Sequence, residues 1–157
     1  MSLFAELIEK GVLCPSAARL RVLYVCTGNS CRSQMAEGWT RALMRNLIEP
    51  HSAGVELHGL DPRAVEAMAE AGVDISWNRP KPLDGLRLNS FDCIVTLSER
   101  ARAEVALSGY SDVIIHQGFA ASPKTGTSEP LEYYRRVRDD LRQFILNVCT
   151  RILSGRI

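Results

Sequence analysis

Cys26 and Arg32 are the two residues whose types and spacing first suggest chemistry, within the stretch YVCTGNSCRSQMAEG (24–38). The cysteine ends an apolar run, the arginine follows six positions later, and helical spacing begins after it. A loop between a strand and a helix can gather backbone N–H groups into an anion-binding nest, and the helix dipole adds positive potential. Such a field favours the thiolate, the nucleophilic form of cysteine. The pair therefore predicts in-line attack on a tetrahedral oxyanion, with the guanidinium placing two donors on its oxygens.

Other uses of this cysteine fit the loop less well. A cysteine at a strand end is commonly a small buried hydrophobe, but that use does not account for the arginine six positions on. Cys26 and Cys31 form a C-x4-C pair without a second pair of zinc ligands, and the three histidines lack zinc-finger spacing. A Walker phosphate loop is excluded because the sequence has no G-x4-G-K-[ST]. Gly28 allows a tight bend, and Asn29 tolerates a left-handed conformation, as a phosphate-binding loop requires.

The elements that must position this loop alternate between strands and helices. Strands are expected at 20–25, 52–57, 91–97 and 112–116, and helices at 33–48, 61–72, 98–107 and from 131 to about 148. Asp61, Pro62 and Gly72 supply a cap, a first-turn proline and a terminating glycine, and Ser98 is a second candidate cap. This order predicts a single doubly wound α/β domain, with a four-stranded parallel sheet and helices on both faces. Ligands bind such sheets at the carboxyl ends of the strands, where the Cys26 loop begins.

Residues 1–19 are expected to be an N-terminal extension with a short amphipathic helix, and 20–157 the α/β domain. Leu3, Phe4, Leu7 and Ile8 follow helical spacing. Charged residues interrupt this stretch where a signal peptide needs an unbroken apolar run, so we expect a cytoplasmic protein.

Composition and charge exclude several classes of partner. Apolar residues make up 46% of the 157, charged residues 24%, and the formal net charge is +1. This balance gives no support to a nucleic acid or a membrane surface as partner. The five cysteines are odd in number and show no even spacing, which argues against a secreted disulfide scaffold.

Cys26-x5-Arg32-Ser33 resembles the signature loop of the low-molecular-weight protein-tyrosine phosphatase superfamily. The longer string CTGNSCRSQMAEGW most resembles the arsenate reductase branch, as do HSAGVELHGLDPRAVEAMAEAGVDIS and EYYRRVRDDLRQFI. The resemblance covers roughly residues 20–150 and implies a phosphatase-like α/β fold for residues 20–157.

The resemblance implies a role for each loop residue. Cys26 would be the nucleophile, Arg32 the oxyanion clamp, and Asn29 and Ser33 would orient the loop and steady the thiolate. The oxyanion-binding loop would be formed by Thr27, Gly28, Asn29, Ser30 and Cys31. Cys31 could also close a disulfide with Cys26, which in this superfamily is often a protective or regulatory pair.

No cofactor is required by this chemistry, but relatives of the thioredoxin-linked type can hold a potassium ion beneath the loop. The positions that match its ligands are Asn29, Glu37, Ser52 and Asp74. The alternative for these four residues is helix capping and loop hydrogen bonding.

Two departures from the family pattern affect the expected mechanism. Thioredoxin-linked reductases carry a redox cysteine just after the strand that reads VTL here, where this chain has Ser98, and no cysteine lies between 94 and 148. A serine cannot attack a sulfur–arsenic adduct and form a disulfide, so an external thiol or redoxin would have to act. The family's Asp-Pro general acid is also missing from QGFAASPKTGTSEP (117–130), in which Glu129 is the only carboxylate. Losing such an acid costs typically 10²–10⁴-fold, and Glu129 is the candidate replacement.

Three functions remain open on the sequence. The first is an arsenate reductase that acts on a small inorganic oxyanion, arsenate or phosphate being the ligand, with an external thiol or redoxin as reductant. The second is a protein-tyrosine phosphatase that hydrolyses phosphate monoesters through a cysteinyl-phosphate. Phosphotyrosine needs aromatic or apolar walls to grip its ring, and the stretches LHGL around His58 and SPKT from Ser122 contain no Phe, Tyr or Trp, which favours a small inorganic oxyanion. The third is a weakly catalytic oxyanion-binding module.

Overall fold

The computed structural model describes residues 18–119 and 130–155. Its elements are β1 (Leu20–Cys26), α2 (Arg32–Leu43), β2 (Ile48–Gly54), α3 (Pro62–Glu70), the 3₁₀ turn η1 (Leu88–Ser90), β3 (Cys93–Thr96), α4 (Glu99–Leu107), β4 (Val113–His116) and α5 (Leu131–Leu153). The predicted amphipathic helix within residues 1–19 falls on 1–17 and so lies outside the described residues. Within the two described ranges, no helix combines the length and apolar character needed to cross a bilayer.

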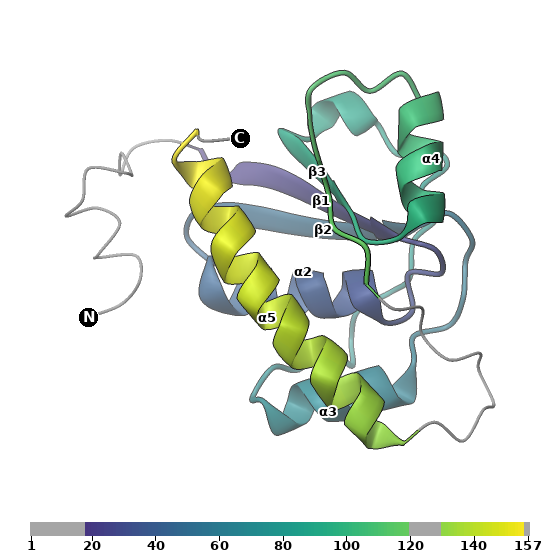
Figure 1. Cartoon of the computed structure of the whole chain (residues 1–157), viewed down its shortest axis with the longest axis vertical. Coiled ribbons are helices and arrows are strands. Elements are labelled where there is room, and N and C mark those ends of the chain that lie inside the picture. The colour runs from purple at the N-terminus through teal and green to yellow at the C-terminus, as the bar shows by residue number, and fades with distance from the viewer. Residues whose placement is uncertain (1–17, 120–129, 156–157) are drawn as a thin grey trace.

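The four strands form one parallel sheet in the order β2-β1-β3-β4, which confirms the predicted fold class. Helices α2 and α5 cover one face and α4 covers the other, while α3 packs against α5 (Figure 1). From β1 the chain first crosses to β2 on one side, and later returns to β3 on the other. The carboxyl ends of β1 and β3 therefore form the topological switch point, where open α/β sheets bind ligands.

The region between α2 and β2 differs from the sequence-based expectation. The helix ends at Leu43 rather than at 48, and β2 begins at Ile48 rather than at 52. A turn intervenes, in which the N–H of Ile48 donates to the Met44 carbonyl at 3.0 Å. Pro50, expected to follow the end of the helix, instead pairs with Val22 in β2. Because β2 is an edge strand, a proline that lacks a ladder donor is tolerated there.

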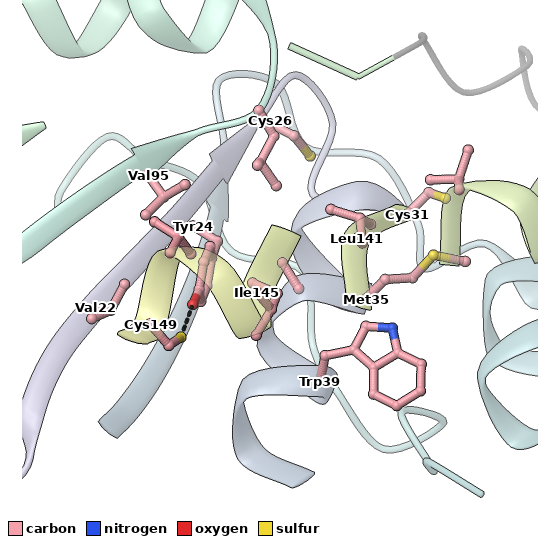
Figure 2. Packing of buried hydrophobic residues seen from close by; sticks show 14 of the residues in the cluster. Val22, Tyr24, Cys26, Cys31, Met35, Trp39, Val95, Leu141, Ile145 and Cys149 are labelled. Carbon is pink, nitrogen blue, oxygen red and sulfur yellow. Dashed lines mark hydrogen bonds between the residues drawn. The ribbon is translucent and has the colours of Figure 1, made fainter. Parts of the chain in front are cut away.

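The core lies on both faces of the sheet, and the larger cluster surrounds the end of β1 from which the Cys26 loop departs (Figure 2). Fully buried Tyr24 donates to or accepts from Thr40 Oγ1 at 2.7 Å and contacts the Cys149 sulfur at 3.7 Å. Burial raises the pKa of Cys93 to about 12 and that of Cys149 to about 11. Cys93 is thus a core residue, and both thiols stay protonated at neutral pH.

Candidate active site

The loop from Cys26 to Arg32 leaves the carboxyl end of β1 and enters α2, as expected from the sequence. Its carbonyl groups are bonded from outside by the segment 55–61. The N–H groups of Val55, Glu56, His58 and Asp61 donate to the carbonyls of Cys26, Thr27, Gly28 and Ser30, at 3.2, 2.7, 3.0 and 3.0 Å. In a trans peptide the N–H points opposite to the C=O, so the N–H groups of the following residues face away from segment 55–61. The loop thus presents its amides on its inner side, as an anion-binding nest requires.

Two glycines permit the close packing of these two segments. A Cβ at Gly28 would lie 2.5 Å from the Nδ1 of His58, and one at Gly54 would lie 2.7 Å from the backbone N of Asn29 and 2.8 Å from the carbonyl carbon of Gly28. At Gly54 the obstacle is backbone that cannot rotate away, so any side chain would displace the loop itself.

Asn29 holds the turn of the loop in the left-handed conformation, with φ of 50°. Its side chain is fully buried and bonded at both ends. The Oδ1 accepts from the Lys81 N–H at 2.7 Å and from Gln34 Nε2 at 3.1 Å, while Nδ2 donates to Ser33 Oγ at 2.8 Å. Asparagine tolerates this backbone region better than most residues, and these bonds fix it there.

The Cys26 sulfur lies 2.9 Å from Ser33 Oγ, and the cysteine is 2% exposed. Ser33 Oγ accepts from Asn29, and when Cys26 is a thiolate the serine hydrogen is donated to the sulfur, because a thiolate can only accept. A hydroxyl that donates to a thiolate favours the charged form. The structure thus brings Cys26, the expected nucleophile, together with Ser33 and Asn29, the two residues expected to steady its thiolate.

Arg32 begins α2 and is 6% exposed. Its Nη1 donates to the carbonyl of Phe119 at 3.2 Å, which anchors the guanidinium to the segment after β4. Among the described residues its buried Nε has no hydrogen-bond partner. An unsatisfied buried donor costs about 1–3 kcal/mol, and an oxyanion bound in the loop would remove that cost. The first turn of α2 also carries no acidic side chain that would repel an anion.

The four residues matched to potassium ligands are only partly brought together. Glu37 and Ser52 are in direct contact, with Ser52 Oγ donating to Glu37 Oε2. The other carboxylate oxygen accepts from Arg41 Nη2, one helical turn along α2. Asp74 is exposed, and its hydrogen bonds with Ser76 lower the pKa of its carboxyl group.

The carboxylate oxygens of Glu37, Asn29 Oδ1 and Asp74 Oδ1 therefore already accept hydrogen bonds from protein donors, the Ser52 hydroxyl donates to Glu37, and a guanidinium supplies the positive charge at Glu37. As placed, the residues do not fit a potassium ion. Nor do the described residues contain any group of three or more His, Cys, Asp or Glu side chains that could hold a metal.

Of the two departures from the family pattern, one lies within the described residues and the other outside them. Ser98, at the position of the family's redox cysteine, is the N-cap of α4, as the sequence predicted. Its Oγ accepts from the Ala101 N–H at 3.2 Å and from the Thr27 hydroxyl at 3.1 Å. The position thus lies against the Cys26 loop but carries a helix cap in place of a thiol. Glu129, the candidate general acid, lies outside the described residues.

Sequence reasoning missed the side chains that support the loop from below. Gln34 is fully buried, and its Nε2 donates to both the carbonyl and the Oδ1 of Asn29; its Oε1 accepts from Asn78. In the sequence, Gln34 lies at the start of a predicted helix and Asn78 lies in a polar connection, and polar residues at such places are usually on the surface. The one available signal was that Gln34 directly follows Ser33 on the helix turn that packs beneath the loop.

Comparison with known proteins places these features in one family. The sequence profile described as "Low molecular weight phosphotyrosine protein phosphatase" matches residues 21–149. An arsenate reductase of Staphylococcus haemolyticus is 37% identical over 130 residues, which cover 83% of this chain and 96% of that protein. An arsenate reductase of Halalkalibacterium halodurans is 40% identical over 122 residues, covering 76% and 88%.

Solved structures give the same two kinds of protein. An arsenate reductase in the phosphate binding state superimposes with a TM-score of 0.69 at 29% identity, over 85% of this chain and 98% of that one. A low molecular weight protein tyrosine phosphatase from T. tengcongensis superimposes with a TM-score of 0.73 at 30% identity, over 84% and 99%.

Proposed function

This chain belongs to the low molecular weight phosphotyrosine protein phosphatase family, and we propose that it is an arsenate reductase that takes its electrons from an external thiol. The observation that carries the proposal is the placement of Cys26 and Arg32 across a loop whose carbonyls are bonded from outside, with the buried Nε of Arg32 left without a partner among residues 18–119 and 130–155. The named relatives supply the choice of arsenate within the family.

In the binding step, the inner N–H groups of the loop from Thr27 to Arg32 surround a tetrahedral oxyanion. The Arg32 guanidinium, anchored through Nη1 at Phe119, offers its free Nε and a second nitrogen to two oxygens of the anion. Phosphate has the same shape and charge as arsenate, so it binds as a competitor.

In the first chemical step, the Cys26 thiolate attacks arsenic and forms a sulfur–arsenic bond while one arsenate oxygen leaves and is protonated to water. Arg32 and the loop amides stabilise the charge that builds on the remaining oxygens. Ser33 holds the thiolate in line before attack. Glu129 is the proposed proton donor to the leaving oxygen.

In the reductive step, an external thiolate attacks the Cys26 sulfur and a mixed disulfide forms. The electron pair of the sulfur–arsenic bond stays on arsenic, which leaves as arsenite. A second thiol then reduces the mixed disulfide and restores Cys26, so two thiols are oxidised for each arsenate reduced. Both thiols are proposed to come from outside, because Ser98 holds the relay position from which an internal thiol would attack the adduct, and burial raises the pKa of Cys93 to about 12.

The test is a side-by-side assay of the purified protein with arsenate and with an aryl phosphate, each with and without a small thiol. We expect arsenite release that depends on both Cys26 and the thiol, and inhibition by phosphate. Aryl phosphate hydrolysis without any arsenite release would instead assign the site to phosphate monoesters.

The phosphatase function is kept as a second candidate because the family profile and the T. tengcongensis structure are those of tyrosine phosphatases. The side chain that closes over Gly28 is the imidazole of His58, and no aromatic residue stands within 55–60 to grip a phosphotyrosine ring. A small inorganic oxyanion needs no such wall, which favours arsenate.

A further inference from the structure

A continuous series of side-chain hydrogen bonds runs from Arg41, in the last turn of α2, to the Cys26 sulfur. Arg41 Nη1 donates to Asn78 Oδ1 at 3.4 Å, and Asn78 Nδ2 donates to Gln34 Oε1 at 2.9 Å. Gln34 Nε2 donates to Asn29 Oδ1 at 3.1 Å. The series ends with the bonds from Asn29 Nδ2 to Ser33 Oγ at 2.8 Å and from Ser33 Oγ to the sulfur at 2.9 Å.

The direction of the first four bonds in this series is fixed by groups that can act in only one way, and in the fifth the Cys26 thiolate can only accept, so Ser33 donates. Arginine is a donor without an acceptor atom, so the atom of Asn78 that faces it is the oxygen, and the Asn78 amide nitrogen faces Gln34. At the other end, the Lys81 backbone N–H donates to the Asn29 side chain, which fixes that atom as Oδ1. Gln34 Nε2 also reaches the backbone carbonyl of Asn29 at 3.2 Å, which only a donor can do. All donors therefore point toward Cys26.

Arg41 is held in place from three sides. Its Nη2 forms an ion pair with Glu37, whose side chain is 7% exposed, and its Nη1 donates a hydrogen bond to Asn78. The guanidinium carbon lies 4.8 Å from the centre of the Trp77 ring, in a cation–π contact. Because Glu37 neutralises its charge, Arg41 acts on the distant thiol by orienting the amides between them.

We propose that Arg41 and Asn78 are positioning residues for the Cys26 thiolate, which they steady through Gln34, Asn29 and Ser33. This inference rests on the proposed role of Cys26 as the nucleophile. The guanidinium uses two different nitrogens for Glu37 and Asn78, so it holds the helix and the 74–82 connection in one register. The oriented amides then keep Asn29 in its left-handed conformation and keep the Ser33 hydrogen on the sulfur.

Other charged and titratable groups also lie around the loop. Arg32 begins α2, Cys31 precedes it, and in α5 burial, the hydrogen bond to Asp61 and the nearby Cys31 raise the pKa of the Tyr134 phenol. His58 covers Gly28 and bonds Glu56 at 3.1 Å. The variants below leave all of these unchanged, and Asn78→Ala also leaves the Arg41–Glu37 pair and the Trp77 contact in place, so the two single variants together report on the hydrogen-bond series.

The experiment measures the rate of Cys26 alkylation by iodoacetamide between pH 5 and 9, with the modified residue identified by mass spectrometry. The variants are Arg41→Lys, which keeps the charge but has one nitrogen, Asn78→Ala, and the double variant. Arg45→Lys and Asn89→Ala make the same changes at exposed positions and are the matched controls. Thermal unfolding of each protein checks that it is folded.

We expect each single variant to slow alkylation at pH 7 by about threefold to tenfold and to move the midpoint of the pH profile upward, since one unit in that midpoint is tenfold. The double variant should be no slower than Asn78→Ala, because both residues act through the same bonds. The controls should match the wild type.

An unchanged pH profile in folded Arg41→Lys and Asn78→Ala would overturn the inference while leaving the proposed function standing. Additive effects in the double variant would also overturn it, because they would mean that Arg41 acts through space. If Cys26 in the wild type reacted no faster than a free thiol and phosphate gave no protection, the proposed function itself would fail.

Discussion

At the scale of single residues, the site places the Cys26 thiol against a hydroxyl and the loop amides, and among the described residues it leaves the buried Nε of the Arg32 guanidinium without a partner. Cys26 is 2% exposed, yet it faces the Ser33 hydroxyl and the inner amides of its loop instead of hydrocarbon alone. Cys93 and Cys149 are buried to the same degree but lie away from the loop amides, and burial raises the pKa of both thiols even though the Tyr24 hydroxyl contacts Cys149. The local donors, and not burial, therefore distinguish the reactive cysteine from the structural ones.

Replacing the nucleophile separates chemistry from binding. Cys26→Ser should abolish turnover and keep measurable affinity for phosphate, because the loop amides and Arg32 remain in place. Isothermal titration calorimetry with phosphate, run beside the arsenate assay, checks both halves of this prediction. A folded Cys26→Ser protein without any heat of phosphate binding would contradict the oxyanion-binding role of the loop.

Replacing the clamp tests the geometry of the guanidinium. Arg32→Lys should reduce kcat/KM by roughly a hundredfold, as the loss of one preorganised donor to a transition-state oxyanion typically does. The ammonium group keeps the charge but cannot place two parallel donors on the anion or also reach the Phe119 carbonyl. Steady-state kinetics with arsenate give the measurement, and a rate equal to that of the wild type would remove Arg32 from the mechanism.

At the scale of elements, the Cys26 loop is shaped by segment 55–61, which has no expected catalytic role but packs directly against the loop. Segment 55–61 bonds the loop carbonyls, and its last residue, Asp61, also caps α3 and accepts from the Tyr134 hydroxyl of α5 at 2.7 Å. One short segment thus ties the loop, α3 and α5 together. The nest is formed by this tertiary contact as much as by the residues of the loop.

Gly54 is the position at which this contact can be tested. Gly54→Ala should destabilise the protein by about 1–3 kcal/mol and weaken phosphate binding, because its Cβ would meet loop backbone at 2.7 Å. Gly59→Ala is the matched control, since a Cβ there meets nothing within 4 Å. Urea unfolding and phosphate titration of both variants give the comparison. Equal stability and affinity in the two would contradict the close packing.

The elements also show what the sequence could predict. Cys26, Arg32 and the Asp61 and Ser98 caps follow from local patterns, and each lies where it was expected. The start of β2 could not be predicted in the same way, because Pro50 is tolerated only through the position of β2 at the sheet edge. The bonds of Gln34 with Asn78 join residues 44 positions apart, which no local pattern contains.

At the scale of the whole molecule, the fold brings three connections to the carboxyl edge of the sheet: the Cys26 loop, the cap of α4 and the segment after β4. Ser98 touches Thr27 beside the nucleophile, and the Phe119 carbonyl holds Arg32. A thiol at position 98 would therefore stand against the loop, as the family pattern implies for the internal relay. The serine turns the same position into a helix cap and leaves reduction to an external donor.

The missing relay gives the last prediction. Arsenate and thioredoxin alone should yield little arsenite with the unmodified protein, because no thiol stands at the relay positions, whereas a small thiol, with or without a glutaredoxin-like partner, should support turnover. Ser98→Cys should restore only part of the thioredoxin-driven route, since the second relay cysteine is also absent.

Ser98→Ala is the control for this substitution, because it removes the α4 cap without adding a thiol and so reports the cost of losing the Ala101 and Thr27 bonds. Arsenite release is measured for all three proteins with each donor. Efficient thioredoxin-driven turnover by the unmodified protein would contradict the mechanism, and it would make Cys31, the other buried cysteine of the loop, the first candidate for the resolving thiol.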